Sequence, residues 1–320
     1  MTKIAIFPGS DFSTAQWLFR FLNKMPKKYQ VTLYFSKTPM KAIHLPPNGA
    51  QFSMYERGLL PHIHRILDQY PPLEEAVCFS PQGLAKKYNT QVFMLENINT
   101  PCFTEQLKAE NFRAAVSIRC MQIFHQPIIN TFDGIPFLNL HSGALPGCKG
   151  AMPLFWTKFN RESLATLSLH EIVRGIDEGR VVGKTTFAID QNMSLLELSC
   201  KSVPYGVDLV LETLNRELSG QRVFPEPINH TLDKYNSYPS QDDIARFESD
   251  GSKLLPEDPL DFVLKAYAAQ EQGLLDKLYK AVNEVIDRDY SDVTRRDPRF
   301  FSGKTGLIDQ ALSRNPNFRP

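Results

Sequence analysis

Short runs of strand-forming residues alternate with helical patterns along much of this chain, and this alternation constrains the fold most. The first run, KIAIF at residues 3–7, ends in a Pro-Gly-Ser turn, and a helical pattern with Trp17 and Phe21 on one face follows it. Strands separated by helices are typical of parallel sheets. The sequence therefore predicts an α/β fold with a mostly parallel sheet. The further strand candidates are VTLYF at 31–35, QVFML at 91–95, AAVSI at 114–118, FLNL at 137–140, LATLSLHEI at 164–172 and VVGKTTFAI at 181–189.

Helix signals lie between and after these runs. Ser194 is a good N-cap, and Glu197 stands at the capping-box position three residues on. Pro204 and Gly206 predict a break or a kink in the helix that begins there. The proline-rich stretch 37–52 predicts a loop. The remaining helical patterns cover residues 55–69, 104–109 and 151–159.

The composition changes near residue 223. The stretch FPEPINHTLDKYNSYPSQDD contains three prolines and many turn formers, which indicates a linker or an extended arm. Helical patterns follow at 242–248 and 258–288, and the last 25 residues are expected to be poorly ordered. We therefore expect two domains, residues 1–220 and 221–320, of which the second is a smaller, mainly helical C-terminal extension. The aromatic residues Tyr235, Tyr238 and Phe247 either pack locally or lie over the first domain.

Charge and cysteine content exclude several classes of protein. The 36 Lys+Arg and 35 Asp+Glu give a net charge of +1, which argues against a nucleic-acid partner. Residues 240–320 hold 15 acidic and 12 basic residues, a net charge of −3, and the other 239 residues carry +4. The five cysteines form no CxxC pair, so neither a disulfide framework nor a metal site is expected.

Targeting and membrane signals are weak in this sequence. The start, MTKIAIFPGS, lacks the apolar core and cleavage site of a signal peptide. No stretch approaches 18 apolar residues, so no membrane span is expected. These features predict a cytoplasmic protein with no membrane partner.

The segment 137–183 carries the residues best suited to chemistry. Asn139 and His141 are two apart at the end of a predicted strand, so both point to the same side. Ligands bind at such carboxyl ends in open α/β sheets. Asp177 follows, held between glycines in Gly-Ile-Asp-Glu-Gly. An amide that donates to an oxyanion, an imidazole that accepts a proton and a carboxylate that orients it suffice for acyl transfer to an amine.

Each candidate also has a purely structural interpretation. A single histidine beside a strand is commonly a packing residue, and Asp177 between glycines can be a turn former. His170 can contact substrate or only pack within its strand. Cys148 could be a nucleophile, but no base is evident for it. The Gly9-Ser10 turn is too short to be a dinucleotide-binding fingerprint.

The combined pattern resembles the folate-dependent formyltransferase family, whose signature is N-x-H-x-S-L-L-P-x-x-x-G followed by Asp-Thr-Gly. The second part is matched by Asp177 and Gly179, with Glu178 in place of Thr. The resemblance covers roughly residues 1–215 and departs from the family in the His-Ser-Gly-Ala-Leu-Pro-Gly-Cys-Lys-Gly loop. The first part of the signature is matched by Asn139, His141, Leu145, Pro146 and Gly150.

This resemblance implies a Rossmann-like formyltransferase core and transfer of formyl from N10-formyltetrahydrofolate to an amine, without a metal. It implies that Asn139 stabilises the oxyanion, that His141 is the general base or a second donor, and that Asp177 holds His141. Substrate contacts are expected at Ser10, Ser142 and His170. The implied folate shelf comprises Arg119, Cys120, Met121, Gln122, Ile123 and Phe124 on one loop, and Val173, Arg174, Gly175 and Ile176 on another.

The acceptor stays open among several alternatives. The acidic, helical C-terminal part disfavours methionyl-tRNA, because a tRNA-binding domain needs basic charge. A small amine, such as an amino sugar nucleotide or an amino-acid-like metabolite, is therefore the first hypothesis. A methionyl-tRNA formyltransferase, a formyltetrahydrofolate hydrolase and a folate-binding protein without catalysis are the alternatives. A homodimer is possible.

Overall fold

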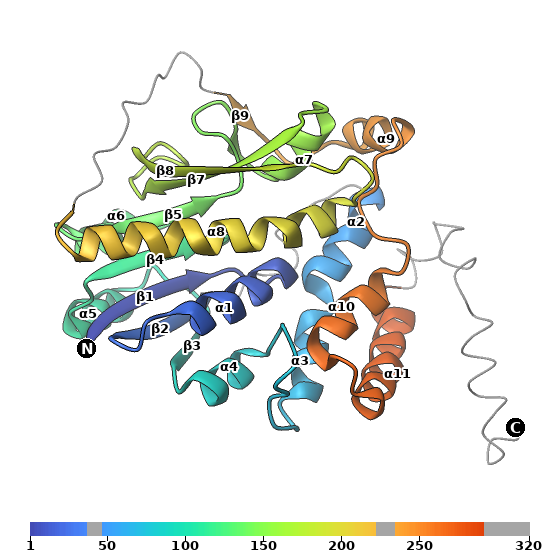
Figure 1. The fold of residues 1–320 in the computed structure, drawn as a ribbon, viewed down its shortest axis with the longest axis horizontal. Coiled ribbons are helices and arrows are strands. Elements are labelled where there is room, and N and C mark those ends of the chain that lie inside the picture. Colours follow the sequence, from blue (N-terminus) through green and yellow to red (C-terminus); the bar gives the residue numbers. More distant parts are fainter. Residues whose placement is uncertain (37–46, 222–233, 291–320) are drawn as a thin grey trace, which may run out of the picture.

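The computed structural model describes residues 1–36, 47–221 and 234–290. Its centre is a seven-stranded sheet in the order β3-β2-β1-β4-β5-β7-β8, seen in Figure 1. The pairs β1–β2, β2–β3, β1–β4 and β4–β5 are parallel, whereas β5–β7 and β7–β8 are antiparallel. The predicted α/β fold with a mostly parallel sheet is confirmed. The strands are β1 Thr2–Pro8, β2 Tyr29–Ser36, β3 Gln91–Leu95, β4 Ala114–Ile118, β5 Phe137–His141, β7 Leu164–Glu171 and β8 Val181–Ala188.

Alternate residues of the parallel strands enter two different cores. In β1, Ile4 and Ile6 pack in the core beneath α1 (Phe12–Lys24) and α8 (Leu195–Leu218). On the opposite face, Ala5 and Phe7 pack with residues of α5 (Pro101–Glu110) and α6 (Gln126–Ile129). Because successive side chains of a strand point to opposite faces, helices must cover both sides of this sheet. Figure 1 shows α8 and α1 running along one of these faces.

Helix α8 begins as the sequence predicts but does not break. The Ser194 side chain accepts from the Glu197 backbone N–H, and the Glu197 carboxylate accepts from the Ser194 N–H, which completes the capping box. The helix then continues through Pro204 to Leu218, so the predicted break is wrong. Val203 and Val207 are fully buried against the sheet on either side of Pro204. This packing offsets the backbone hydrogen bond that a proline removes.

The C-terminal part is helical, as predicted. It comprises α9 (Gln241–Ser249), α10 (Pro259–Ala268) and α11 (Gln272–Asp289). In Figure 1, α10 and α11 lie beside α3 (Leu60–Leu67), beyond the carboxyl ends of the parallel strands. The predicted helix 258–288 is thus two helices, separated where Ala269 has a positive φ of 53°.

The proline-rich stretch 37–52 is not entirely a loop. Residues 47–53 form α2 (Pro47–Ser53), so the loop prediction is wrong there, and 37–46 lie outside the described residues. Pro47 opens the helix, where a missing N–H costs nothing. A π-helical turn, Met54–Gly58, links α2 to α3. The first part of the predicted arm and the last 30 residues also lie outside the described ranges. The other helices are α4 (Pro81–Tyr88), the 3₁₀ helix Asn130–Phe132 and α7 (Pro153–Phe159).

A second, two-stranded sheet joins distant parts of the chain. Strand β6 (Lys149–Gly150) pairs in parallel with β9 (Tyr235–Asn236). Further along the same segment, Phe155 of α7 stacks on Phe247 of α9, with ring centroids 4.7 Å apart. The segment after residue 233 therefore packs on the first part of the chain.

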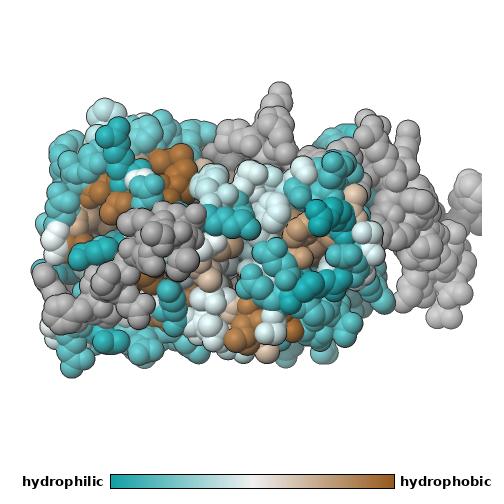
Figure 2. Space-filling view, turned by 90° about the horizontal axis from the view of Figure 1, so that it is seen from above, coloured by the Kyte–Doolittle hydropathy of each residue, from teal (hydrophilic) through white to brown (hydrophobic). Residues whose placement is uncertain are grey.

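The surface is mixed in character. Figure 2 shows a mostly hydrophilic face that is interrupted by a few hydrophobic patches. Among the described helices, none combines the length and the hydropathy of a membrane span.

Candidate active site

Strands β5 and β7 bring three polar side chains to one face of the sheet. In the antiparallel register, Asn139 lies opposite His170, and His141 lies opposite Ser168. The intervening Leu140 and Leu169 point the other way, into the core beneath α1 and α8. The period of two along each strand thus places Asn139, His141 and His170 together, as the sequence predicts for the first two.

Asp177 reaches these residues from the loop between β7 and β8. It adopts the left-handed conformation, with φ of 54°. One carboxylate oxygen lies 3.5 Å from His141 Nδ1, and the other lies 3.4 Å from His170 Nε2. The glycine at 179 is required, because a Cβ there would meet the Glu171 carbonyl oxygen at 1.7 Å. The loop can therefore close tightly enough to bring the carboxylate to both imidazoles.

The imidazole of His141 is enclosed by the loop that follows it. Its Nε2 lies 2.6 Å from the Cys148 carbonyl oxygen, which can only accept a hydrogen bond. Nε2 therefore carries the proton in the neutral ring, and the unprotonated Nδ1 faces Asp177. The ring is 7% exposed. A Cβ at position 143 would lie 2.9 Å from Nε2, so a glycine is needed for the loop to cover the ring.

Asn139 and His170 form a second linked pair. His170 Nδ1 donates to the Glu171 carbonyl oxygen at 2.9 Å. Its Nε2 then accepts from Asn139 Nδ2 at 3.0 Å, which fixes the orientation of the Asn139 amide. The second N–H of that amide stays available for a ligand. His170 is 3% exposed and lies beneath Asn139 and Asp177, with both ring nitrogens engaged.

Burial and charge shift the titration of this cluster. Burial lowers the pKa of His141 below its ordinary value, although the Asp177 charge and the Cys148 carbonyl act in the opposite direction. Burial tends to raise the pKa of Asp177, but the adjacent His170 and His141 imidazoles and the hydrogen bond from the Gly150 N–H outweigh this and hold it below its ordinary value. At neutral pH the pair is thus a neutral imidazole beside a carboxylate, the form in which a base accepts a proton.

The first predicted shelf loop, 119–124, is tied down by side chains rather than free. Arg119, with φ of 52°, directs its guanidinium to Asp11 and Glu56. Gln122 bonds the Glu96 carbonyl and the Ile98 N–H. The remaining members are Cys120, whose Sγ lies 3.8 Å from Ser36 Oγ, the half-buried Met121, the buried Phe124 and Ile123, which is 56% exposed.

The second predicted shelf loop also leaves apolar side chains uncovered. Val173 is 41% exposed and Ile176 is 45% exposed, on the loop that carries Gly175 and Asp177. Together with Ile123 they are the exposed hydrophobic side chains of the two shelf loops among the described residues. Exposed apolar side chains on loops that flank a polar cluster suit the flat face of an aromatic ligand.

The turn after β1 holds a charged residue that the sequence predictions overlooked. Asp11 caps α1 by accepting from the Thr14 N–H and also accepts from Arg119 Nε at 3.1 Å. Burial raises its pKa, but the charges of Arg119 and Arg57 outweigh this and hold it below the ordinary value. A polar residue directly before a helical pattern is an N-cap signal, so Asp11 could have been found. Its partner Glu56 carries no such signal.

The predicted substrate residues fall in different surroundings. Ser10 is half-buried in the turn between Gly9 and Asp11. Ser142 lines a shallow, open pocket on the α1 and α8 side, together with Arg119 and Trp17. His170 lies in the polar cluster itself. The structure therefore brings Asn139, His141, His170 and Asp177 together, with Ser142 next to them in the chain.

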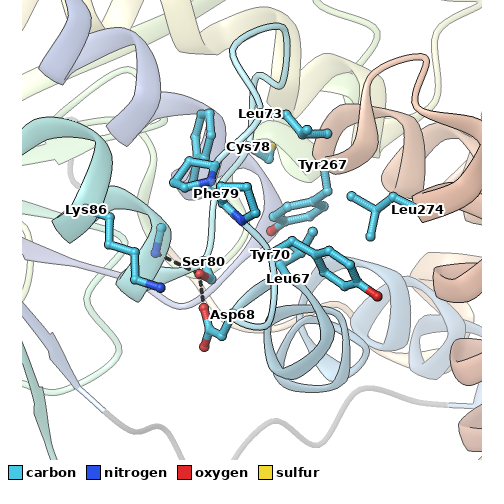
Figure 3. A pocket seen from close by; sticks show the side chains of 13 residues that line it. Leu67, Asp68, Tyr70, Leu73, Cys78, Phe79, Ser80, Lys86, Tyr267 and Leu274 are labelled. Carbon is cyan, nitrogen blue, oxygen red and sulfur yellow. Dashed lines mark hydrogen bonds between the residues drawn. The ribbon is translucent and has the colours of Figure 1, made fainter.

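A second pocket lies away from this cluster. Figure 3 shows it between the end of α3, the start of α4 and α10, with Tyr70, Phe79 and Tyr267 among its lining residues. Its polar groups bond one another, since Ser80 Oγ donates to Asp68 and accepts from the Gly83 N–H. None of the predicted site residues lines it. Over the described ranges, no cluster of three or more His, Cys, Asp or Glu residues suits a metal ion.

Comparison with known proteins was made on sequence and on structure. No family model matches the chain. The methionyl-tRNA formyltransferase of Pelobacter propionicus is 26% identical over 172 residues, which is 54% of this chain and 50% of that protein. The enzyme of the same name from Mycoplasma pneumoniae is 30% identical over 146 residues, 43% of this chain and 46% of that protein. The chain thus spans about half the length of these curated relatives.

Solved structures share the fold at low sequence identity. An N-formyltransferase from Helicobacter canadensis, in complex with folinic acid and dTDP-3-aminofucose, superposes with a TM-score of 0.50 and 19% identity over 76% of this chain and 72% of that one. Glycinamide ribonucleotide transformylase 1 from Symbiobacterium toebii gives 0.51 and 12% identity over 70% and 91%. The core therefore has the formyltransferase fold. The predicted resemblance is confirmed, and the chain is a distant relative of the formyltransferase enzymes.

Proposed function

We propose that this protein transfers a formyl group from N10-formyltetrahydrofolate to the amine of a small molecule. The observation that carries the proposal is the cluster of Asn139, His141 and Asp177 at the carboxyl end of β5, with Asp177 3.5 Å from His141 Nδ1. An amide donor, a neutral imidazole and a carboxylate supply what direct attack of an amine on a formyl carbon requires. No covalent intermediate on the protein is needed.

Asn139 is the group proposed to stabilise the oxyanion. One N–H of its amide is held by His170 Nε2 at 3.0 Å, which leaves the other N–H in a fixed direction. A donor that is oriented before the reaction stabilises the developing charge without reorganisation. His170 therefore acts as a positioning residue for Asn139 in this proposal.

His141 is proposed to take the proton of the attacking amine. Because Nε2 already donates to the Cys148 carbonyl, the new proton is accepted at Nδ1, 3.5 Å from the Asp177 carboxylate. The resulting imidazolium is then stabilised by the carbonyl on one side and by the carboxylate on the other. The lowered pKa of His141 keeps it unprotonated at neutral pH and ready to act as a base.

The folate is proposed to lie against the two shelf loops. Ile123, Val173 and Ile176 supply exposed apolar surface on either side of the polar cluster. Main-chain groups of 119–124 and 173–176 are the proposed polar contacts of the pterin ring. The structural neighbour from Helicobacter canadensis is complexed with folinic acid, which supports a folate donor here.

A small amine is the proposed acceptor. The C-terminal part is helical and residues 240–320 carry −3, which does not suit a polyanionic tRNA. An amino sugar nucleotide or an amino-acid-like metabolite meets these constraints, and the Helicobacter canadensis neighbour is complexed with an amino sugar nucleotide.

Methionyl-tRNA is the second candidate acceptor, because the curated sequence relatives include methionyl-tRNA formyltransferases. That likeness covers about half of each relative, so it supports the shared donor chemistry more than the acceptor. A cytoplasmic location accords with either acceptor and is part of the proposal.

The test is a donor-turnover assay with an acceptor panel. The purified chain is mixed with N10-formyltetrahydrofolate and with amino sugar nucleotides, glycinamide ribonucleotide, amino acids or methionyl-tRNA. We expect release of tetrahydrofolate and a formylated small amine, and we expect loss of both in His141→Ala and Asn139→Ala. Formylation of methionyl-tRNA alone would overturn the small-amine acceptor. Formate release without any amine would indicate a hydrolase, and folate binding without turnover would indicate a non-catalytic protein.

A further inference from the structure

The loop that encloses His141 is itself held by a segment from far along the chain. We call residues 234–238 the C-terminal arm. The Lys149 N–H donates to the Lys234 carbonyl at 2.9 Å, and the Ala151 N–H donates to the Asn236 carbonyl at 2.8 Å. These two bonds flank the β6–β9 pairing. The loop backbone on both sides of Gly150 is thus fixed to the arm.

Side chains add to this attachment. Asn236, which is 7% exposed, directs Nδ2 to Cys148 Sγ at 3.4 Å. Trp156 Nε1 donates to the Ser237 carbonyl at 3.1 Å, which anchors the arm to α7. The same Cys148 supplies the carbonyl that receives the His141 Nε2 proton. Contacts of the arm therefore reach the residue that bonds His141.

Gly150 connects the arm to the carboxylate. Its N–H donates to Asp177 Oδ2 at 2.9 Å, the oxygen that faces His141. Its φ is +92°, and a Cβ at this position would lie 2.2 Å from the Asn236 carbonyl oxygen. Only a glycine lets the loop lie this close to the arm while its N–H points at Asp177.

We propose that the C-terminal arm positions the site: through Asn236 and the β6–β9 pairing it holds the Gly150 N–H and the Cys148 carbonyl in place, and these fix Asp177 and His141 relative to each other. The proposal rests on the proposed function, since it concerns the pair that would move the proton. In this arrangement Asn236 and Gly150 are positioning residues, and neither touches substrate.

The Asp177–His141 pair needs this support because two hydrogen bonds with the loop hold it, one from the Gly150 N–H to Asp177 and one from His141 Nε2 to the Cys148 carbonyl. Asp177 stands on the loop between β7 and β8, and its Oδ2 is 3.5 Å from the imidazole, too far for the histidine alone to fix it. The Gly150 N–H supplies a directional bond from the opposite side. A loop that moved away would release both the carboxylate and the Nε2 proton of His141. Holding that loop requires an outside support, and the arm provides it.

The first test is amide hydrogen exchange on the full chain without ligand. Asn236→Ala removes the side-chain contact with Cys148 and leaves the backbone of the arm intact. We expect the amides of Lys149, Gly150 and Ala151 to exchange faster together, on the order of five- to tenfold, as the loss of one hydrogen bond allows. Asn215→Ala, which removes an equivalent side-chain bond to Tyr29 OH at another place, is the control and should leave these amides unchanged.

Two exchange results would overturn the proposal. If Lys149 and Ala151 exchange faster while Gly150 keeps its protection, the loop holds Asp177 without the arm. If none of the three amides changes, Asn236 does not tie the loop at all.

The second test is an NMR titration of the His141 imidazole. In Gly150→Ala the added Cβ must displace either the loop or the arm, so Asp177 and the loop that buries His141 lose their fixed places and the pKa of His141 should shift away from that of the wild type. Gly251→Ala is the matched control, because Gly251 has a similar φ of +81° but no atom within 4 Å of the added Cβ. Equal His141 titration in wild type, control and Gly150→Ala would contradict the proposal.

Both readouts need neither donor nor acceptor. A protein that fails the formyl-transfer assay can still show arm-dependent exchange and titration, so the two proposals fail separately. Where an acceptor is found, Gly150→Ala should lower kcat more than it raises KM and should alter the pH profile, whereas Gly251→Ala should not.

Discussion

One carboxylate oxygen of Asp177 lies 3.5 Å from Nδ1 of His141, although His141 ends strand β5 and Asp177 stands on the loop between β7 and β8. The other oxygen lies 3.4 Å from His170 Nε2. A single carboxylate thus links the base to the residue that orients Asn139. Changes at Asp177 should therefore affect the titration of His141 as well as turnover.

Asp177→Asn should lower the pKa of His141. Burial lowers that pKa and the Asp177 charge raises it, so removal of the charge leaves burial opposed only by the Cys148 carbonyl. The weaker base should slow formyl transfer by about 10²- to 10⁴-fold. An NMR titration of His141 and the donor-turnover assay measure the two effects. Glu178→Gln removes a charge from an exposed neighbour and is the control; a His141 pKa that is the same in Asp177→Asn as in wild type would contradict this prediction.

Arg119→Met should destabilise the fold strongly. The substitution leaves the fully buried Asp11 carboxylate without its ion-pair partner and the Glu56 carboxylate, only 7% exposed, with Arg57 alone. Breaking such a buried pair costs about 3–5 kcal/mol. Urea unfolding measures the loss. Arg180→Met breaks an ion pair with Glu171 whose arginine is 63% exposed, and it should cost less than about 1 kcal/mol. Equal losses in the two variants would show that the buried network is not stabilising.

Gly206→Ala should destabilise α8 against the sheet. The new Cβ would lie 2.8 Å from Leu140 Cδ2 and 3.3 Å from Leu167 Cδ1, inside a packed core. Overpacking of this kind costs about 1–3 kcal/mol, although alanine favours the helix by itself. Gly273→Ala in α11 meets only a glutamate side chain at 3.4 Å and should be neutral or stabilising by up to about 1 kcal/mol. Thermal unfolding of both variants checks the sign, and a stabilised Gly206→Ala would disprove the prediction.

The half-buried His64 should make stability fall in mild acid. Burial lowers its pKa from 6.5 to about 4, and its Nε2 lies 3.2 Å from Tyr267 OH. The unfolded chain therefore takes up this proton first as the pH falls. The stabilising contribution is complete above about pH 6.5 and is lost progressively toward pH 4. The free energy of unfolding, measured in urea from pH 7.5 to 4, should fall less steeply in His64→Gln, and the same slope in both proteins would contradict this.

Much of the fold could be predicted because its signals are local. The strands 91–95 and 114–118 were predicted to the residue, since strand formers there are bounded by polar residues and turns. The capping box at Ser194 was likewise evident. The errors came where packing overrides local preference. Pro204 does not break α8, and the proline-rich residues 47–52 belong to a helix.

For the candidate site too, some features follow from local sequence signals and others from packing. Asn139 and His141 follow from the period of a strand, and Asp177 from its glycine-flanked turn, so the sequence by itself determined which groups could do the chemistry. The sequence does not determine the distances between these groups. Only the tertiary structure decided that His170 lies beneath Asn139, that Arg119 bonds Asp11 and Glu56, and that Asn236 supports the loop at Gly150. The physical reason is that these contacts join residues distant in the chain, and burial and hydrogen bonding in the folded core select them rather than local conformational preference.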